Sequence, residues 1–158
     1  MKKINRLASL LFILLLIIII PLSVPRFFGF SIYNVLSDSM EPSISTGSIV
    51  YIKPVNIEMI KENDIVSFYS QANKVVTHRI TKIEDNLLTT KGDHNQDIDI
   101  SKVNILNVIG KVTFSIPFWG YINDFLSNIG GMTGLFIVLV FIMLLWLWCY
   151  YAEKKKSA

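Results

Sequence analysis

Cysteine is nearly missing from this sequence, in which Cys149 is the one cysteine among 158 residues. An internal disulfide and a cysteine metal cluster are therefore excluded. Charge is also scarce, because 17% of the residues are charged whereas 52% are hydrophobic. Typical soluble domains have about 25% charged residues. The shortage of charge lies at the two ends of the chain, and this distribution indicates a membrane protein rather than an ordinary soluble domain.

Two uncharged stretches near the ends are each long enough to cross a bilayer. The nineteen residues from Leu7 to Pro25 carry no charge, and neither do the twenty-eight residues between Asp124 and Glu153. A spanning helix needs about 20 predominantly apolar residues. The first stretch follows a basic start, as a secretory signal does, but no A-x-A-like small-residue site follows it. We therefore expect an uncleaved anchor helix at one end and a second membrane-spanning helix at the other.

The charges predict how the chain is oriented in the membrane. The net charge is +3, but residues 27–124 contain eight Lys and Arg against eleven Asp and Glu, a balance of −3. Basic clusters flank the outer ends of the apolar stretches, and such clusters mark the cytoplasmic side. Their position favours membrane orientation over contact with nucleic acid. We predict cytoplasmic basic tails (1–6 and 153–158), transmembrane helices (7–25 and 125–152) and an extracytoplasmic β domain (26–124).

The middle segment has the pattern of a mainly β domain. Short runs rich in β-branched and aromatic residues are separated by turn signals at intervals of about 8–12 residues, a spacing typical of small antiparallel barrels or sandwiches. The expected β segments are residues 49–55, 64–70, 74–84 and 87–90, followed by an apolar stretch, 103–109, and a closing segment, 110–116.

A hydroxyl-rich turn, residues 37–42, follows the first apolar stretch, and we interpret Ser39 as a candidate nucleophile. A serine needs an adjacent base, oriented by a third group, before it can attack a carbonyl. Strand alternation places His78 on the same face as Val76 and Ile80. Desolvation on an apolar face favours a neutral imidazole, which is the form that a general base needs.

Other assignments compete with this one. His94, the second histidine, lies beside Asp93 in a polar loop and could equally be solvated. That loop begins like a calcium loop, but the required Gly and closing Glu are replaced by Ile98 and Asn104. A core histidine on a strand is a common structural feature, and Lys74 and Lys82 share the face of His78, which leaves a Ser-Lys mechanism open.

Three ordered motifs together resemble one enzyme family. Ser-x-Ser-Met-Glu-Pro follows the anchor, Thr-His-Arg-Ile lies on a predicted strand, and Lys-Gly-Asp-x-Asn is followed by an Asp six residues after its first. This order, from about Val35 to Gly120, resembles the type I signal peptidases. The branch that it resembles most is found in the endoplasmic reticulum, in archaea and in some Gram-positive bacteria (the SipW-like enzymes), with histidine in place of the usual lysine.

The resemblance implies roles for individual residues. It makes Ser39 the nucleophile, His78 the general base, and Asp99 and Asp93 the important acids, with Asp99 favoured as the group that orients His78. It also implies that the N–H of Ser39 and the hydroxyl of Ser37 form the oxyanion hole. Which of the two acids contacts the imidazole does not follow from the sequence.

The resemblance further implies a signal-peptidase-type small β domain and a serine endopeptidase that removes signal peptides from exported preproteins at the cell membrane. It implies no cofactor and no metal. The expected partners are signal peptides, membrane lipid and the secretion machinery, with no nucleic acid. An alternative hypothesis is a non-catalytic, membrane-anchored β module that binds an envelope partner. A self-cleaving Ser-Lys protease of the repressor type is disfavoured by the two apolar stretches.

Overall fold

The computed structural model describes the backbone of residues 2–157 and the side chains of residues 6–7, 9–128, 130, 133–148 and 151. The chain divides into two compact units. Pro25–Asn123 form one, called here the β unit, and the residues up to Val24 together with those from Asp124 onward form the other, the helical unit. Apart from Arg6, the side chains of the predicted basic tails lie outside the described set, as does that of Cys149.

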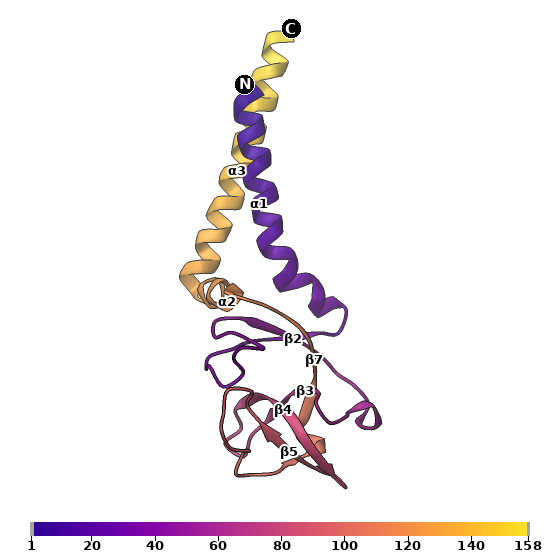
Figure 1. Ribbon diagram of the computed structural model, residues 1–158. Coiled ribbons are helices and arrows are strands. Elements are labelled where there is room, and N and C mark those ends of the chain that lie inside the picture. The colour runs from indigo at the N-terminus through magenta and orange to yellow at the C-terminus, as the bar shows by residue number, and fades with distance from the viewer. Residues whose placement is uncertain (1, 158) are drawn as a thin grey trace. The chain divides into compact units, whose positions relative to one another are not determined.

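Two long helices make up most of the helical unit. They are α1 (Lys2–Phe27) and α3 (Ile129–Ser157), and they lie side by side (Figure 1), with the rings of Phe12 and Trp146 5.3 Å apart. Among the described residues, Ser9–Phe27 is the one helical segment long and apolar enough to cross a membrane, and Thr133–Trp148 is a shorter apolar stretch. The apolar N-terminal helix is therefore confirmed, whereas the second span and the orientation of both helices stay predictions.

The β unit is built on one antiparallel sheet of seven strands in the order β1-β2-β7-β3-β4-β5-β6. The prediction of a mainly β, antiparallel domain is confirmed. The connection to α3 includes a short helix, α2 (Trp119–Ser127). The strands, coloured from purple to orange in Figure 1, are β1 (Ser31–Asn34), β2 (Ile49–Lys53), β3 (Ile65–Tyr69), β4 (Val75–Glu84), β5 (Leu87–Lys91), β6 (Val103–Asn104) and β7 (Val108–Ile116).

Turn residues explain where the central strands end. Asn73 and Asp85 both have a positive φ, of 56° and 52°, at the turns that join β3 to β4 and β4 to β5. Asn and Asp tolerate this left-handed conformation better than most residues. The two hairpins therefore begin and end within a residue or two of the predicted limits.

The segment from Val103 to Ile116 divides at a different place from the one expected, which was after Ile109. It contains the two-residue strand β6, a 3-10 turn (Ile105–Asn107) and then β7. The side chain of Asn104 accepts a hydrogen bond from the backbone N–H of Leu106 at 2.9 Å. This local cap favours the turn over continued extension, because an Asn side chain can replace a backbone acceptor. A second 3-10 turn, Ile57–Met59, precedes β3.

Two apolar clusters form the core of the β unit. One packs Ile60, Val66, Phe68, Ile80, Leu88, Val103 and Ile105. The other packs Val35, Met40, Ile44, Val50 and Ile52. The second cluster matters for function because Met40 follows Ser39 directly, so the turn that carries the serine is fixed to the core.

Candidate active site

The turn that carries Ser39 is held by its neighbours. The side chain of Met40 is 1% exposed and packs in the second core cluster. The carboxylate of Glu41 accepts hydrogen bonds at 3.4 Å from both the N–H and the hydroxyl of Thr46. The backbone N–H of Glu41 donates to the carbonyl of Asp38 at 2.9 Å. The Met-Glu part of the motif therefore fixes a tight turn on which Ser39 stays partly exposed.

His78 lies on β4 and contacts the serine. Its Nε2 atom is 3.2 Å from Ser39 Oγ, although the two residues are 39 positions apart in the sequence. His78 is 9% exposed, and the ring of Phe68 meets its ring edge-on at 6.5 Å between centroids. A buried imidazole within hydrogen-bond distance of a hydroxyl is the arrangement that nucleophilic catalysis by serine requires.

Asp99 is the acid on the other side of the imidazole. His78 Nδ1 lies 2.6 Å from Asp99 Oδ2. The same oxygen accepts a hydrogen bond from Thr90 Oγ1, also at 2.6 Å, and the N–H of Asp99 donates to the carbonyl of Thr90 at 2.8 Å. With Nδ1–H donated to the carboxylate, the lone pair of Nε2 faces the serine. Ser39, His78 and Asp99 therefore form a continuous line of contacts that can accept a proton from the hydroxyl.

Asp93 has a different partner. Its two carboxylate oxygens accept hydrogen bonds from Nε and Nη2 of Arg79, at 2.8 and 2.6 Å. This bidentate ion pair holds the pKa of the Asp93 carboxyl below its ordinary value. Arg79 also donates to the carbonyl of Asn63 at 2.9 Å. Asp93 therefore ties its loop to β4, while Asp99 is the carboxylate in contact with the imidazole.

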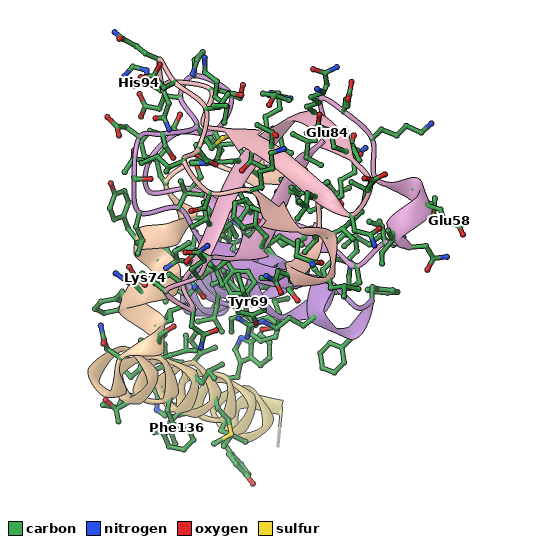
Figure 2. The ribbon with its side chains drawn as sticks, turned by 90° about the horizontal axis from the view of Figure 1, so that it is seen from below. Glu58, Tyr69, Lys74, Glu84, His94 and Phe136 are labelled. Carbon is green, nitrogen blue, oxygen red and sulfur yellow. The ribbon has the colours of Figure 1, made fainter. Side chains whose placement is uncertain are left out.

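Gly92 explains why a glycine precedes Asp93. A Cβ atom placed on Gly92 would lie 2.5 Å from the backbone carbonyl oxygen of Ser39. Two residues later, the N–H of His94 donates to the same oxygen at 2.9 Å. The loop therefore supports the serine turn through its backbone. This contact uses the main chain of His94 and not its imidazole, which is exposed and lies at the periphery (Figure 2).

The remaining sequence candidates take the following places. Ser37 Oγ lies 3.2 Å from Ser39 Oγ, so its hydroxyl is adjacent to the point where an oxyanion would form. Lys82 forms an ion pair with Glu84 at 2.6 Å, and a register shift in β4 after Ile80 breaks the alternation that would place Lys82 beside His78. Lys74 precedes β4 and is exposed. Neither lysine forms a hydrogen bond with Ser39 in the part of the chain that the structure describes.

The residues described hold no group of three or more His, Cys, Asp and Glu side chains that could bind a metal ion. The carboxylates of Asp93 and Asp99 are instead engaged by Arg79 and His78. The calcium-loop alternative thus has no set of ligands within this part of the chain.

A cavity of about 370 Å³ opens beside Ser39, and we call it the serine cavity. One wall is the first part of β4, residues 75–78, and the other includes residues 34–37 with Ser39 and Met40. β4 pairs with β5 only from Arg79 onward, so within the part of the chain that the structure describes, the edge of residues 75–78 that faces away from β3 has no strand partner. The site therefore combines the Ser39 hydroxyl with an open strand edge.

Sequence reasoning missed three contributors to this site. Thr90 is fully buried and its hydroxyl contacts Asp99, but its position two residues before Gly92 gave no signal by itself. Arg79 was noted only as part of the Thr-His-Arg-Ile motif, with no role of its own. The close approach of Gly92 to Ser39 was also missed, although a glycine between charged residues in a loop is a known sign of close backbone contact.

Comparison with known proteins bears on the resemblance. No family model matches the chain. The chain is similar to Signal peptidase I W of Bacillus subtilis (strain 168), with 40% identity over 99 residues. The match covers 59% of this chain and 52% of the relative, so the chain spans about half the length of the curated relative it matches. This similarity confirms the resemblance to the type I signal peptidases that the three motifs indicated.

Proposed function

We propose that this chain is a membrane-anchored serine endopeptidase that removes N-terminal signal peptides from exported preproteins. The observation that carries the proposal is the line of contacts from Ser39 through His78 to Asp99, with distances of 3.2 and 2.6 Å. The name of the similar protein, a signal peptidase, supports the substrate class. The same proposal places the catalytic domain on the outer side of the membrane, with the secretion machinery as an expected partner.

The proposed mechanism uses these contacts. Ser39 Oγ attacks the carbonyl carbon of the scissile bond while His78 Nε2 takes its proton, and Asp99 stabilises the imidazolium that forms. The hydroxyl of Ser37 and the N–H of Ser39 donate to the oxyanion, a type of contact whose removal typically costs about 10²–10³ in rate. His78 then gives the proton to the leaving amine. Water releases the acyl group from Ser39 with His78 again acting as base.

The open edge of β4 supports an extended substrate. A peptide strand laid in the serine cavity can pair its main chain with residues 75–77, in the manner of strand addition to a sheet edge. The residues that precede the scissile bond would then reach Ser39. The family resemblance implies small side chains at these positions.

Exposed aromatic side chains support a location at the lipid surface. Phe27, Phe28 and Phe118 are 88%, 72% and 71% exposed. Aromatic residues gather at membrane interfaces, where a ring can enter the boundary between headgroups and acyl chains. Membrane lipid is therefore a proposed partner, and signal peptides would be presented where they leave the bilayer.

The test is cleavage of a purified preprotein by the full chain in detergent micelles. Ser39→Ala and His78→Ala are each expected to lower kcat by about 10⁴-fold or more, because triad members act as a unit. His94→Ala is the matched control, since its imidazole is exposed and its backbone contact is kept. Full cleavage by His78→Ala would refute the mechanism. A cellular phenotype that is unchanged by Ser39→Ala would favour the non-catalytic binding module instead.

A further inference from the structure

A second, larger cavity lies on one face of β4. It has a volume of about 690 Å³ and is bounded by the β3–β4 hairpin and by residues 95–103. Its apolar lining includes Phe68 and Val76 from the hairpin strands and Ile98 and Ile100 from the other segment. We call it the isoleucine cavity. Its volume is within the range of about 300–1,000 Å³ that is usual for ligand sites.

The β4 residues that line the two cavities show on which face the larger one lies. The serine cavity follows the open edge of the strand and is lined by all four of Val75, Val76, Thr77 and His78. Of these four, only Val76 and His78 also line the isoleucine cavity. Side chains at alternate positions of a strand share a face, so the isoleucine cavity lies on the face of Val76 and His78. Thr77 lies on the other face, where its hydroxyl is 2.7 Å from that of Ser67.

A peptide strand added at this edge divides its side chains in the same way. Successive residues of a strand point to opposite faces, and pockets for alternate side chains give such an addition its specificity. In the proposed function, the residues before the scissile bond lie along residues 75–77, with the attacked carbonyl at Ser39. Every second side chain of this half of the substrate therefore points to the face of the isoleucine cavity.

The imidazole of His78 determines which side chains these are. Its Nε2 atom is 3.2 Å from Ser39 Oγ, so the space next to the serine on this face is already filled. The residue whose carbonyl Ser39 attacks therefore turns its side chain to the opposite face, beside Thr77. The residue before it lies beside Val76, and its side chain points to the isoleucine cavity.

We propose that the isoleucine cavity binds the side chain of the second residue before the scissile bond and favours a large apolar side chain there. This inference rests on the proposed function. It adds a specificity site for the signal-peptide half of the substrate. The first and third residues before the bond point to the opposite face, so their side chains do not enter this cavity.

The lining side chains support an apolar ligand. Ile98 and Ile100 are 56% and 104% exposed, and Val76 is half-buried. A leucine-sized side chain laid on these surfaces removes apolar area from water, which is favourable. Asp97 and Lys102 also line the cavity, so a charged side chain of either sign would meet one like charge.

The segment that forms the outer wall is held to β5 by two hydrogen bonds. The N–H of Asp99 donates to the carbonyl of Thr90 at 2.8 Å, and Lys91 Nζ donates to the carbonyl of Gln96 at 2.9 Å. Ile98 lies between the two anchored positions. Because β5 pairs with β4, this wall is fixed relative to the strand on which the substrate lies.

The test uses the full chain in detergent micelles and three peptides that differ at one residue. The reference peptide has alanine at the first three positions before the scissile bond. The second-position peptide has leucine at the second position, and the third-position peptide has leucine at the third. The unmodified chain is expected to cleave the second-position peptide with a kcat/KM about tenfold above that of the reference, which is the lower end of what a methylene group contributes in an apolar pocket.

Variants of the isoleucines separate this cavity from general effects on activity. The double variant Ile98→Ser, Ile100→Ser is expected to reduce the second-position preference to within about twofold, while the ratio of the third-position peptide to the reference stays the same. Ile100→Ser alone should reduce the preference about threefold, and its fold is not at risk because this side chain is fully exposed. The matched control is Ile57→Ser, an isoleucine that is 44% exposed and lines neither cavity, and it should keep the preference.

The outcomes distinguish the inference from the proposed function. No gain from leucine at the second position, or a gain that every folded variant keeps, would overturn the inference while Ser39-dependent cleavage stands. A loss confined to the third-position peptide would overturn it as well, because the cavity would then receive the opposite set of side chains. Failure of the unmodified chain to cleave any of the peptides would overturn the proposed function itself.

Discussion

Gly92→Ala is expected to impair the proposed nucleophile from a position that touches no substrate. An added Cβ would lie 2.5 Å from the carbonyl oxygen of Ser39, and ordinary contacts begin at 3.4 Å. The separation must therefore grow by about 0.9 Å. The Cβ would also lie 2.8 Å from Asn95 Nδ2, but that side chain can rotate away. The backbone of Ser39 has no such freedom, because Met40 is buried in the core.

The displacement of the Ser39 backbone determines how much activity Gly92→Ala should lose. A misplacement of about 1 Å in an active site can cost about 10²-fold in rate. The shift would also strain the hydrogen bond of 2.9 Å from the N–H of His94 to the Ser39 carbonyl. Overpacking of this kind typically destabilises a fold by about 1–3 kcal/mol. We therefore expect kcat/KM to fall about 10²-fold while the folded state persists.

The assay is cleavage of a preprotein by Gly92→Ala, with circular dichroism to verify the fold. Gly134→Ala is the matched control, because a Cβ there meets nothing within 4 Å and Ala is the better helix former. It should keep full activity. A Gly92→Ala chain with activity within threefold of the original would refute the argument, since the loop would then not support the serine turn.

Two further substitutions test the acids. Thr90→Val removes the hydroxyl that donates to Asp99 at 2.6 Å. The measured kcat should fall about tenfold with little change in KM, because a hydrogen bond to a charged group contributes about 1.5–3 kcal/mol. Thr90→Ser keeps the hydroxyl and should restore kcat. Arg79 lowers the pKa of Asp93, so the pair stabilises the fold above about pH 4 and loses its effect as the pH falls further. Asp93→Asn should therefore lower the free energy of unfolding by about 1.5–3 kcal/mol at pH 7 and by less at pH 3, as measured by urea unfolding in detergent.

Much of the sheet could be predicted from the sequence because its central strands carry local signals. Residues 74–84 are rich in β-branched side chains, which favour strands, and β4 occupies Val75–Glu84. The register shifts could not be predicted, among them the one between Ile80 and Lys82. Such bulges depend on how two strands fit together, and neither strand encodes them alone.

Asp93 and Asp99 illustrate how far the candidate site could be predicted from the sequence. Asp93 and Asp99 lie in one loop, six residues apart, and both are acceptable partners for an imidazole. The choice between them depends on the backbone path, in which the N–H of Asp99 returns to the carbonyl of Thr90. Thr90 then supplies its hydroxyl to the same carboxylate. These contacts are tertiary, and a single sequence holds no record of them.

Asp93 and Asp99 contact different residues, and these two partners are consecutive residues of one strand. Side chains at adjacent positions of a strand point to opposite faces, so His78 and Arg79 cannot share an acid. Asp99 contacts the first and Asp93 the second. The loop between the acids therefore holds β4 from both faces, and the residue before Asp93 is the glycine that packs on Ser39. The three motifs therefore contact one another in the folded chain. The Arg79–Asp93 pair fixes the loop that supports Ser39. The His78–Asp99 pair completes the proposed proton path.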